Sequence, residues 1–104
     1  MFDVKILDYM VKLQEHVKND YLSWGNNSEY SQAHIPQLRL SEGKRFIKII
    51  VMEAGSDRSA FGFIEKETGL VWKAAGWKAP ALNFPRGNIN DETGLKCATW
   101  TGIG

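Results

Sequence analysis

The chain has 104 residues, of which 43% are hydrophobic and 12% aromatic, a composition typical of a globular protein with a single domain over residues 1–104. Thirteen Lys and Arg against twelve Asp and Glu leave a net charge of +1, so attraction to an anionic partner must come from a local cluster of cations. A single cysteine, Cys97, excludes an internal disulfide, and charges interrupt every apolar run, which argues against a membrane span or a signal peptide. We therefore expect a soluble intracellular protein.

Residues 3–22 have the periodicity of an amphipathic helix. Five side chains recur at helical spacing and form one stripe: Ile6, Met10, Leu13, Val17 and Tyr21. Asp3 is the expected N-cap, and His16 falls opposite the stripe, where we expect it to be solvated. The segment 24–36 contains Gly, Asn and Ser and closes with Pro, so it is predicted to be a loop.

From residue 37 onward the periodicity changes to two, which indicates strands. The residues 37–40 alternate, and 45–54 carry apolar side chains on both faces, which is typical of a central strand with a helix on one side. The segments 58–66 and 70–75 flank the turn sequence KETG, and 95–101 is predicted to be a last strand. Short turns without crossover helices favour antiparallel pairing. The expected fold class is therefore α+β, with an N-terminal helix packed on an antiparallel sheet of four or five strands.

The residue patterns of metal sites and of common enzymes are missing from the chain. His16 and His34 are far apart, and the sequence has no Cys-x-x-Cys pair, no clustered carboxylates and no phosphate-binding glycine loop. Cys97 has no nearby histidine and is expected to be a small buried hydrophobe. We therefore expect no metal, no cofactor and no catalytic residue, and an enzyme is the weakest of the candidate classes.

The segment 71–88, VWKAAGWKAPALNFPRGN, is the strongest candidate for a functional surface. Between Glu67 and Asp91 the chain holds three cations and no acid, with aromatic side chains interleaved. Two prolines exclude a regular central strand, so we expect an irregular surface loop, and long loops in small domains are commonly functional. The candidate residues for binding nucleic acid or nucleotide phosphate are Lys73, Trp77, Lys78, Phe84, Arg86, Gly87 and Asn88.

Each residue type in this segment matches a requirement of a phosphate-bearing ligand. Arg86 can form a two-pronged hydrogen bond with phosphate, and the two lysines supply point charge. Gly87 allows backbone N–H groups to approach an anion, and an aromatic ring can stack on a base. The alternative is that the rings point inward and close the end of the sheet. In that case Arg86 and Asn88 bond the carbonyl groups of the loop itself.

A resemblance to a known family rests on the segment FGFIEKETGLVWKAAGWKAPALNFPRGNI. With its motif WKAPA…RGN, this segment resembles small uncharacterised proteins encoded by tailed bacteriophages, over residues 58–95 or about a third of the chain. The chain departs from that pattern at LNFP, residues 82–85, where a Lys-Gly or Lys-His pair is more usual, so one positive charge is lost. The resemblance implies a viral origin and action in the host cytoplasm, and it implies no activity.

Three functions compete for this pattern. The first is binding of nucleic acid or nucleotide through the basic-aromatic loop 72–88. The second is a protein-binding effector that inhibits or redirects a host or defence protein, because tryptophan and arginine are typical interface anchors. The third is a homo-oligomer, since 45–54 is apolar on both faces and a second copy of the chain could cover one of them. None of the three requires a membrane.

Overall fold

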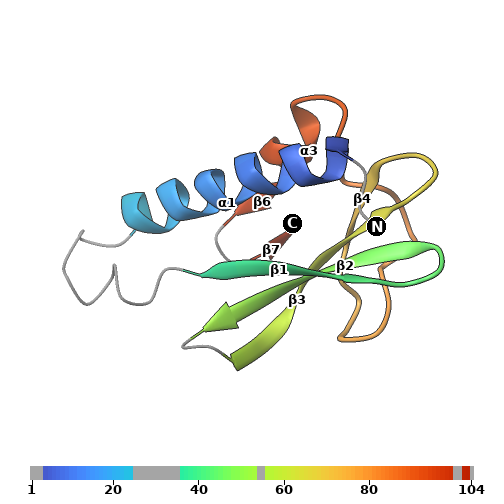
Figure 1. The fold of residues 1–104 in the computed structure, drawn as a ribbon, viewed down its shortest axis with the longest axis horizontal. Coiled ribbons are helices and arrows are strands. Elements are labelled where there is room, and N and C mark those ends of the chain that lie inside the picture. Colours follow the sequence, from blue (N-terminus) through green and yellow to red (C-terminus); the bar gives the residue numbers. More distant parts are fainter. Residues whose placement is uncertain (1–3, 25–35, 54–55, 100–101, 104) are drawn as a thin grey trace.

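The structure is a computed structural model that describes residues 4–24, 36–53, 56–99 and 102–103. One long helix lies along a five-stranded antiparallel sheet, and a short helix and a small two-stranded sheet complete the fold (Figure 1). The elements in chain order are α1 (Val4–Trp24), β1 (Gln37–Glu42), β2 (Phe46–Glu53), β3 (Ser56–Glu65), β4 (Leu70–Lys73), β5 (Gly87–Asn88), α3 (Thr93–Lys96), β6 (Ala98–Thr99) and β7 (Gly102–Ile103). The predicted α+β class is confirmed. The expected cap Asp3, His34 and most of the predicted loop 24–36 lie outside the described residues.

The main core lies between α1 and one face of the sheet. From the predicted helical stripe, Ile6, Leu13 and Val17 are buried, and the sequence reasoning missed Tyr9, which is only 3% exposed. The sheet contributes the alternate side chains of its three middle strands: Ile47, Ile49, Val51, Ile64 and Val71. Because side chains in a strand alternate between faces, Ile47, Ile49 and Val51 lie together on the face of β2 that meets α1. The strand order β1-β2-β3-β4-β5 places β2 inside the sheet, as its two apolar faces predicted.

The opposite face of the sheet also buries apolar side chains. Lys48 pairs with Phe63 across β2 and β3, and Phe63 pairs with Trp72 across β3 and β4, so these three share the face turned away from α1. Phe63 is 3% exposed and Trp72 8% exposed. The chain after β4 folds back on this side, where its Lys78 and Pro80 line a pocket together with Phe63. In Figure 1 this is the orange segment on the side of the sheet away from α1. The chain itself thus covers the second apolar face, which was the observation behind the homo-oligomer hypothesis.

The segment 74–86, between β4 and β5, is an irregular surface loop with a well-defined tip. An isolated bridge between Ala74 and Pro80 closes the tip, and the amides of Ala75 and Gly76 both donate to the Ala79 carbonyl oxygen, at 3.0 and 3.3 Å. Further backbone hydrogen bonds tie the returning chain to β4. Proline lacks the N–H that a regular ladder needs, which is why the segment leaves the sheet. The predicted surface loop is confirmed.

The prediction of a strand over 95–101 is wrong in its first part, where the chain forms the short helix α3. The carboxylate of Asp91 accepts a hydrogen bond from the Thr93 amide at 2.8 Å, which stabilises the turn at the start of this helix. Two amides of the helix then donate to the Glu92 carbonyl oxygen. The chain becomes extended only at Ala98, which pairs with Ile103 of β7.

The expectation that His16 is solvated is also wrong. Strand β6 packs against the side of α1, and the Nε2 atom of His16 lies 3.0 Å from the carbonyl oxygen of Ala98. The side chain is half-buried as a result. Helical periodicity defines only the stripe that faces the large sheet, so it gave no indication that a second small sheet would cover the helix flank.

A buried hydrogen bond at Tyr9 leads to a prediction about alkaline stability. The Tyr9 hydroxyl donates to the Gly94 carbonyl oxygen at 2.6 Å, and burial raises the pKa of this phenol well above its usual value. The unfolded chain therefore loses this proton first. The contribution of the protonated Tyr9 to the free energy of unfolding is complete below the pKa of an unfolded tyrosine, about 10. This contribution declines as the pH rises above that value. We expect Tyr9→Phe to flatten the fall in melting temperature between about pH 9 and about pH 11. An unchanged pH dependence in this variant would contradict the assignment.

Candidate nucleic-acid interface

A pocket rimmed by positive charge lies on the sheet face turned away from α1. It encloses about 320 Å³, and apolar side chains of β2, β3 and the loop 74–86 contribute to its walls. Four cations line it: Lys44, Arg45, Lys48 and Lys78. We call this site the cation pocket. Its cations come from two regions that are about thirty positions apart in the chain, so only the tertiary fold brings them together.

Three structural elements position the cations of this pocket. Lys44 and Arg45 belong to the β1–β2 turn, which a hydrogen bond from the Gly43 amide to the Phe46 carbonyl oxygen closes at 2.9 Å. Lys48 follows on β2 and points to the same face as Phe46 because side chains alternate along a strand. The fourth cation, from the tip of the loop 74–86, approaches from the other side. Four cations thus surround a small volume that one acidic residue, Glu42, also lines.

The acidic side chains beside the pocket are already paired. Glu42 accepts a hydrogen bond from Lys66 at 2.6 Å, and this contact lowers the pKa of its carboxyl group. Glu65 is nearly buried and lies 3.3 Å from both the Arg45 guanidinium and the Trp72 indole nitrogen. Among the residues that the structure describes, no carboxylate lies within ion-pair distance of Lys44, Lys48 or Lys78. The pocket therefore has a local excess of positive charge, in a protein whose net charge is only +1.

Trp77 lies at the edge of this pocket and is in contact with one of its cations. The Lys48 ammonium lies 4.1 Å from the centre of the Trp77 ring, a cation–π contact. The side chain of Trp77 is 44% exposed, and that of Phe84 is 54% exposed. Neither ring is buried in the core, so the structure does not support the alternative in which both rings point inward.

Phe84 and Arg86 form a second aromatic–cation pair away from the cation pocket. The Arg86 guanidinium carbon lies 3.9 Å from the centre of the Phe84 ring, and its Nε atom is buried without a hydrogen-bond partner. The charge of Arg86 acts on the thiol of Cys97, whose pKa is raised chiefly by burial and lowered in part by this arginine. Cys97 packs against the core on the α1 side of the sheet, and Arg86 is not among the residues that line the cation pocket.

The remaining predicted residues have other partners. Lys73 pairs with Gly62 and is exposed on the opposite face of β4 from Trp72. A Cβ atom on Gly87 would lie 2.7 Å from the Thr93 carbonyl carbon and closer still to its oxygen, so this glycine permits tight backbone packing. The amide side chain of Asn88 donates to the Thr68 carbonyl oxygen at 3.2 Å and links β5 to the β3–β4 turn.

The structure thus brings together only part of the predicted set. Lys78 lines the cation pocket and Trp77 contacts it through Lys48. The other predicted residues do not line it: Lys73, Phe84, Arg86, Gly87 and Asn88. Sequence reasoning missed the basic run KRFIK at 44–48, whose pattern predicts only a turn followed by a strand. The alternation along β2 was a usable signal for one of these cations, because it places Lys48 on the face turned away from α1.

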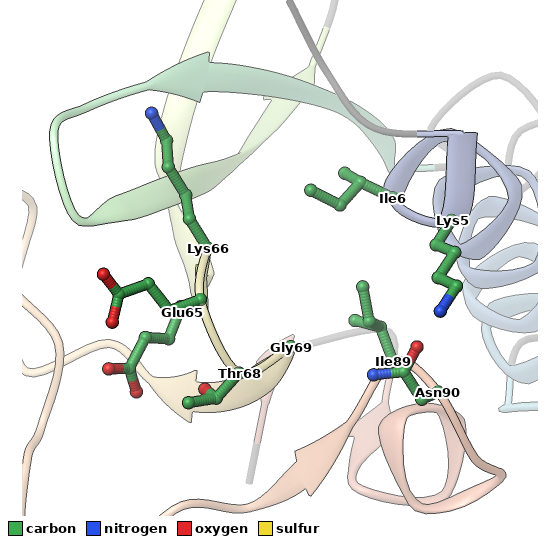
Figure 2. A pocket seen from close by; sticks show the side chains of 9 residues that line it. Lys5, Ile6, Glu65, Lys66, Thr68, Gly69, Ile89 and Asn90 are labelled. Carbon is green, nitrogen blue, oxygen red and sulfur yellow. The ribbon is translucent and has the colours of Figure 1, made fainter.

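A second, smaller pocket of about 160 Å³ lies between the start of α1 and the β3–β4 turn. Figure 2 shows Ile6 and Ile89 facing this space, while the side chains of Lys66 and Glu65 point away from it. The polar groups around it therefore do not converge on a ligand. Within the described ranges, no cluster of three or more His, Cys, Asp or Glu side chains is placed to hold a metal ion, and no helix is long and apolar enough to cross a membrane.

Comparison with known proteins places the chain in a family. Residues 2–103 match DUF7717, a family of unknown function, and the chain belongs to it. No curated protein and no solved structure matches the chain. The family description names no activity and no ligand, so the functional argument depends on the geometry of the cation pocket.

Proposed function

We propose that this chain, as a member of DUF7717, binds nucleic acid through its phosphate groups at the cation pocket. The observation that carries the proposal is the convergence of four cations on one pocket: Lys44, Arg45, Lys48 and Lys78. Of the nearby carboxylates, Glu42 pairs with Lys66, outside this set, and Glu65 pairs with Arg45. Phosphate contacts supply most of the sequence-independent affinity for nucleic acid, and lysine and arginine are the side chains that make them. Trp77 beside these cations adds an aromatic surface, a combination found in proteins that bind nucleic acid.

The charge pattern indicates what kind of affinity to expect. The whole protein is close to neutral, so long-range attraction is weak and binding depends on contacts within this one pocket. Guanidinium and ammonium groups release counterions from phosphate when they bind, which makes the affinity fall with salt. A free nucleotide offers the same phosphate chemistry with fewer charges, so it should bind more weakly and depend less on salt.

The experiment is a titration of fluorescently labelled DNA and RNA oligonucleotides, with ATP as a competitor, at several salt concentrations. Three or four neutralised phosphates predict a slope of roughly −2 to −4 in a plot of log K against log salt concentration. Competition by ATP at micromolar levels would point to a nucleotide-binding protein instead. Absence of binding to every oligonucleotide at low salt would contradict the proposal.

The proposal extends to where the protein acts. The resemblance to tailed-bacteriophage proteins over 58–95 supports a viral origin and action in the host cytoplasm, where host and viral nucleic acids are both present. We propose no catalytic role, because the charged side chains of the pocket are chiefly cations and the carboxylate that lines it, Glu42, is paired with Lys66. Incubating the protein with labelled DNA, RNA and ATP, with and without divalent cations, checks this, and turnover of any of them would contradict it.

A second candidate function, a protein-binding effector, is favoured by a different surface. Val4, Leu7 and Val11 form an apolar stripe on α1 and are 79%, 49% and 72% exposed. A groove of about 590 Å³ runs from this stripe to Leu38 on β1. Scattered exposed apolar residues are common, but a contiguous stripe is typical of protein interfaces. A pull-down from nuclease-treated bacterial lysate tests this function. If the Val11→Glu variant still retains the partner, the stripe on α1 is not the binding surface.

A further inference from the structure

We infer that the nucleic acid bound at the cation pocket is single-stranded and that one of its bases stacks on Trp77. This inference rests on the proposed function and adds to it the class of strand and the residue that recognises a base. Phosphate contacts alone do not distinguish a single strand from a duplex, so the argument depends on the aromatic ring and its surroundings.

The ring of Trp77 is held in place at the pocket before any ligand binds. Its turn is closed by the two hydrogen bonds to the Ala79 carbonyl oxygen, at 3.0 and 3.3 Å. The Lys48 ammonium lies 4.1 Å from the ring centre. A ring fixed in this way loses little conformational entropy on binding, which is what a stacking platform requires. The ring is 44% exposed, so part of its surface remains open to a ligand.

The position of this ring next to phosphate-binding groups favours an unpaired strand. In a duplex the bases are paired and stacked on each other, and only their edges are reachable from the grooves. In a single strand each base is free to leave its neighbours and place its flat face on an aromatic ring. Lys48 contacts the ring, and Lys78 is the next residue in the chain, so phosphates on either side of a stacked base would find cations within reach.

The chain provides its own matched control. Phe84 is 54% exposed and lies against Arg86 at 3.9 Å, so it is also an accessible ring with a cation on one face. It belongs to the same loop, but Arg86 does not line the cation pocket. If stacking requires neighbouring phosphate contacts, the loss of Trp77 matters and the loss of Phe84 does not.

The test compares three ligands of equal length: an oligo-dT strand, the same strand with abasic sites in place of all bases, and a duplex. We expect oligo-dT to bind more tightly than the other two. Trp77→Ala should weaken oligo-dT binding roughly 5- to 150-fold, which is the range measured for the loss of one stacked base. The abasic strand should bind Trp77→Ala and the parent protein equally. Trp77→Phe, which keeps a ring, should recover most of the loss, and Phe84→Ala should bind oligo-dT as the parent does.

The outcomes separate this inference from the function on which it rests. If the abasic strand or the duplex binds the parent as tightly as oligo-dT does, phosphate binding stands and stacking is overturned. An equal loss of oligo-dT and abasic affinity in Trp77→Ala would also overturn stacking, because the variant would then have disturbed the cations. If none of the three ligands binds at low salt, the proposed function falls and the inference falls with it.

Discussion

Reversing the charge of Lys48, which contacts the Trp77 ring, and of Lys78, the residue that follows Trp77 in the chain, is expected to abolish nucleic-acid binding. Lys48→Glu combined with Lys78→Glu replaces two of the four cations of the pocket by acids. The remaining cations would then face carboxylates instead of phosphates, and like charge repels the ligand. For a single strand each lost phosphate contact lowers the salt slope by about 0.7, so the double variant should lose more than about 1.4 from the slope together with most of its affinity. Fluorescence anisotropy at several salt concentrations measures both quantities.

The control for this variant has the same change in net charge at other sites. Lys73→Glu combined with Lys96→Glu alters two exposed lysines, one on the opposite face of β4 and one on α3. Neither lines the cation pocket. We expect this control to bind nearly as the parent does, because a local cluster and not the net charge attracts the ligand. Equal losses of affinity in the two double variants would show that the pocket has no special role. Both variants should keep the melting temperature of the parent within a few degrees.

Gly87→Ala is expected to destabilise the fold strongly without any direct effect on the ligand. The added Cβ atom would lie 2.7 Å from the Thr93 carbonyl carbon and 3.0 Å from the Gly94 nitrogen. Both are backbone atoms, so relief requires a shift of α3 away from β5. Overpacking of this kind costs about 1–3 kcal/mol and more when backbone must move. We expect a loss of at least about 2 kcal/mol in the free energy of unfolding, which lowers the melting temperature by roughly 10 °C in a domain of this size.

Gly76→Ala is the matched substitution for this experiment. Gly76 lies in the tip of the loop 74–86, and a Cβ atom built there meets nothing within 4 Å. Replacing an unconstrained glycine by alanine reduces the conformational freedom of the unfolded chain, so this variant should be unchanged or more stable by about 0.4–1 kcal/mol. Chemical denaturation of both variants measures the difference. If Gly87→Ala keeps its stability but loses affinity for nucleic acid, the glycine contacts an anion, as its position in the sequence first predicted.

Several parts of the fold follow from local patterns. The stripe of apolar residues at helical spacing predicted which face of α1 is buried, since one period of the helix returns each side chain to the same side. The apolar residues on both faces of 45–54 predicted an interior strand. The sequence KETG predicted a turn between two strands, and the structure has that turn, with Gly69 at a φ of 76°. These features depend on residues within a few positions of one another, so periodicity and turn chemistry are sufficient to predict them.

The composition of the candidate site was decided by the tertiary structure. The loop 72–88 stood out because its cations and rings are adjacent in sequence, yet adjacent residues in an irregular loop turn to different sides. Arg86 lies against the ring of Phe84 and does not line the cation pocket, whereas Lys78 does. The cations that join Lys78 come from 44–48, which local patterns assigned to a turn and a strand. By itself the sequence determined the helix, the interior strand and the surface loop; only long-range packing decided which charges share a pocket, because that depends on where the loop folds back onto the sheet.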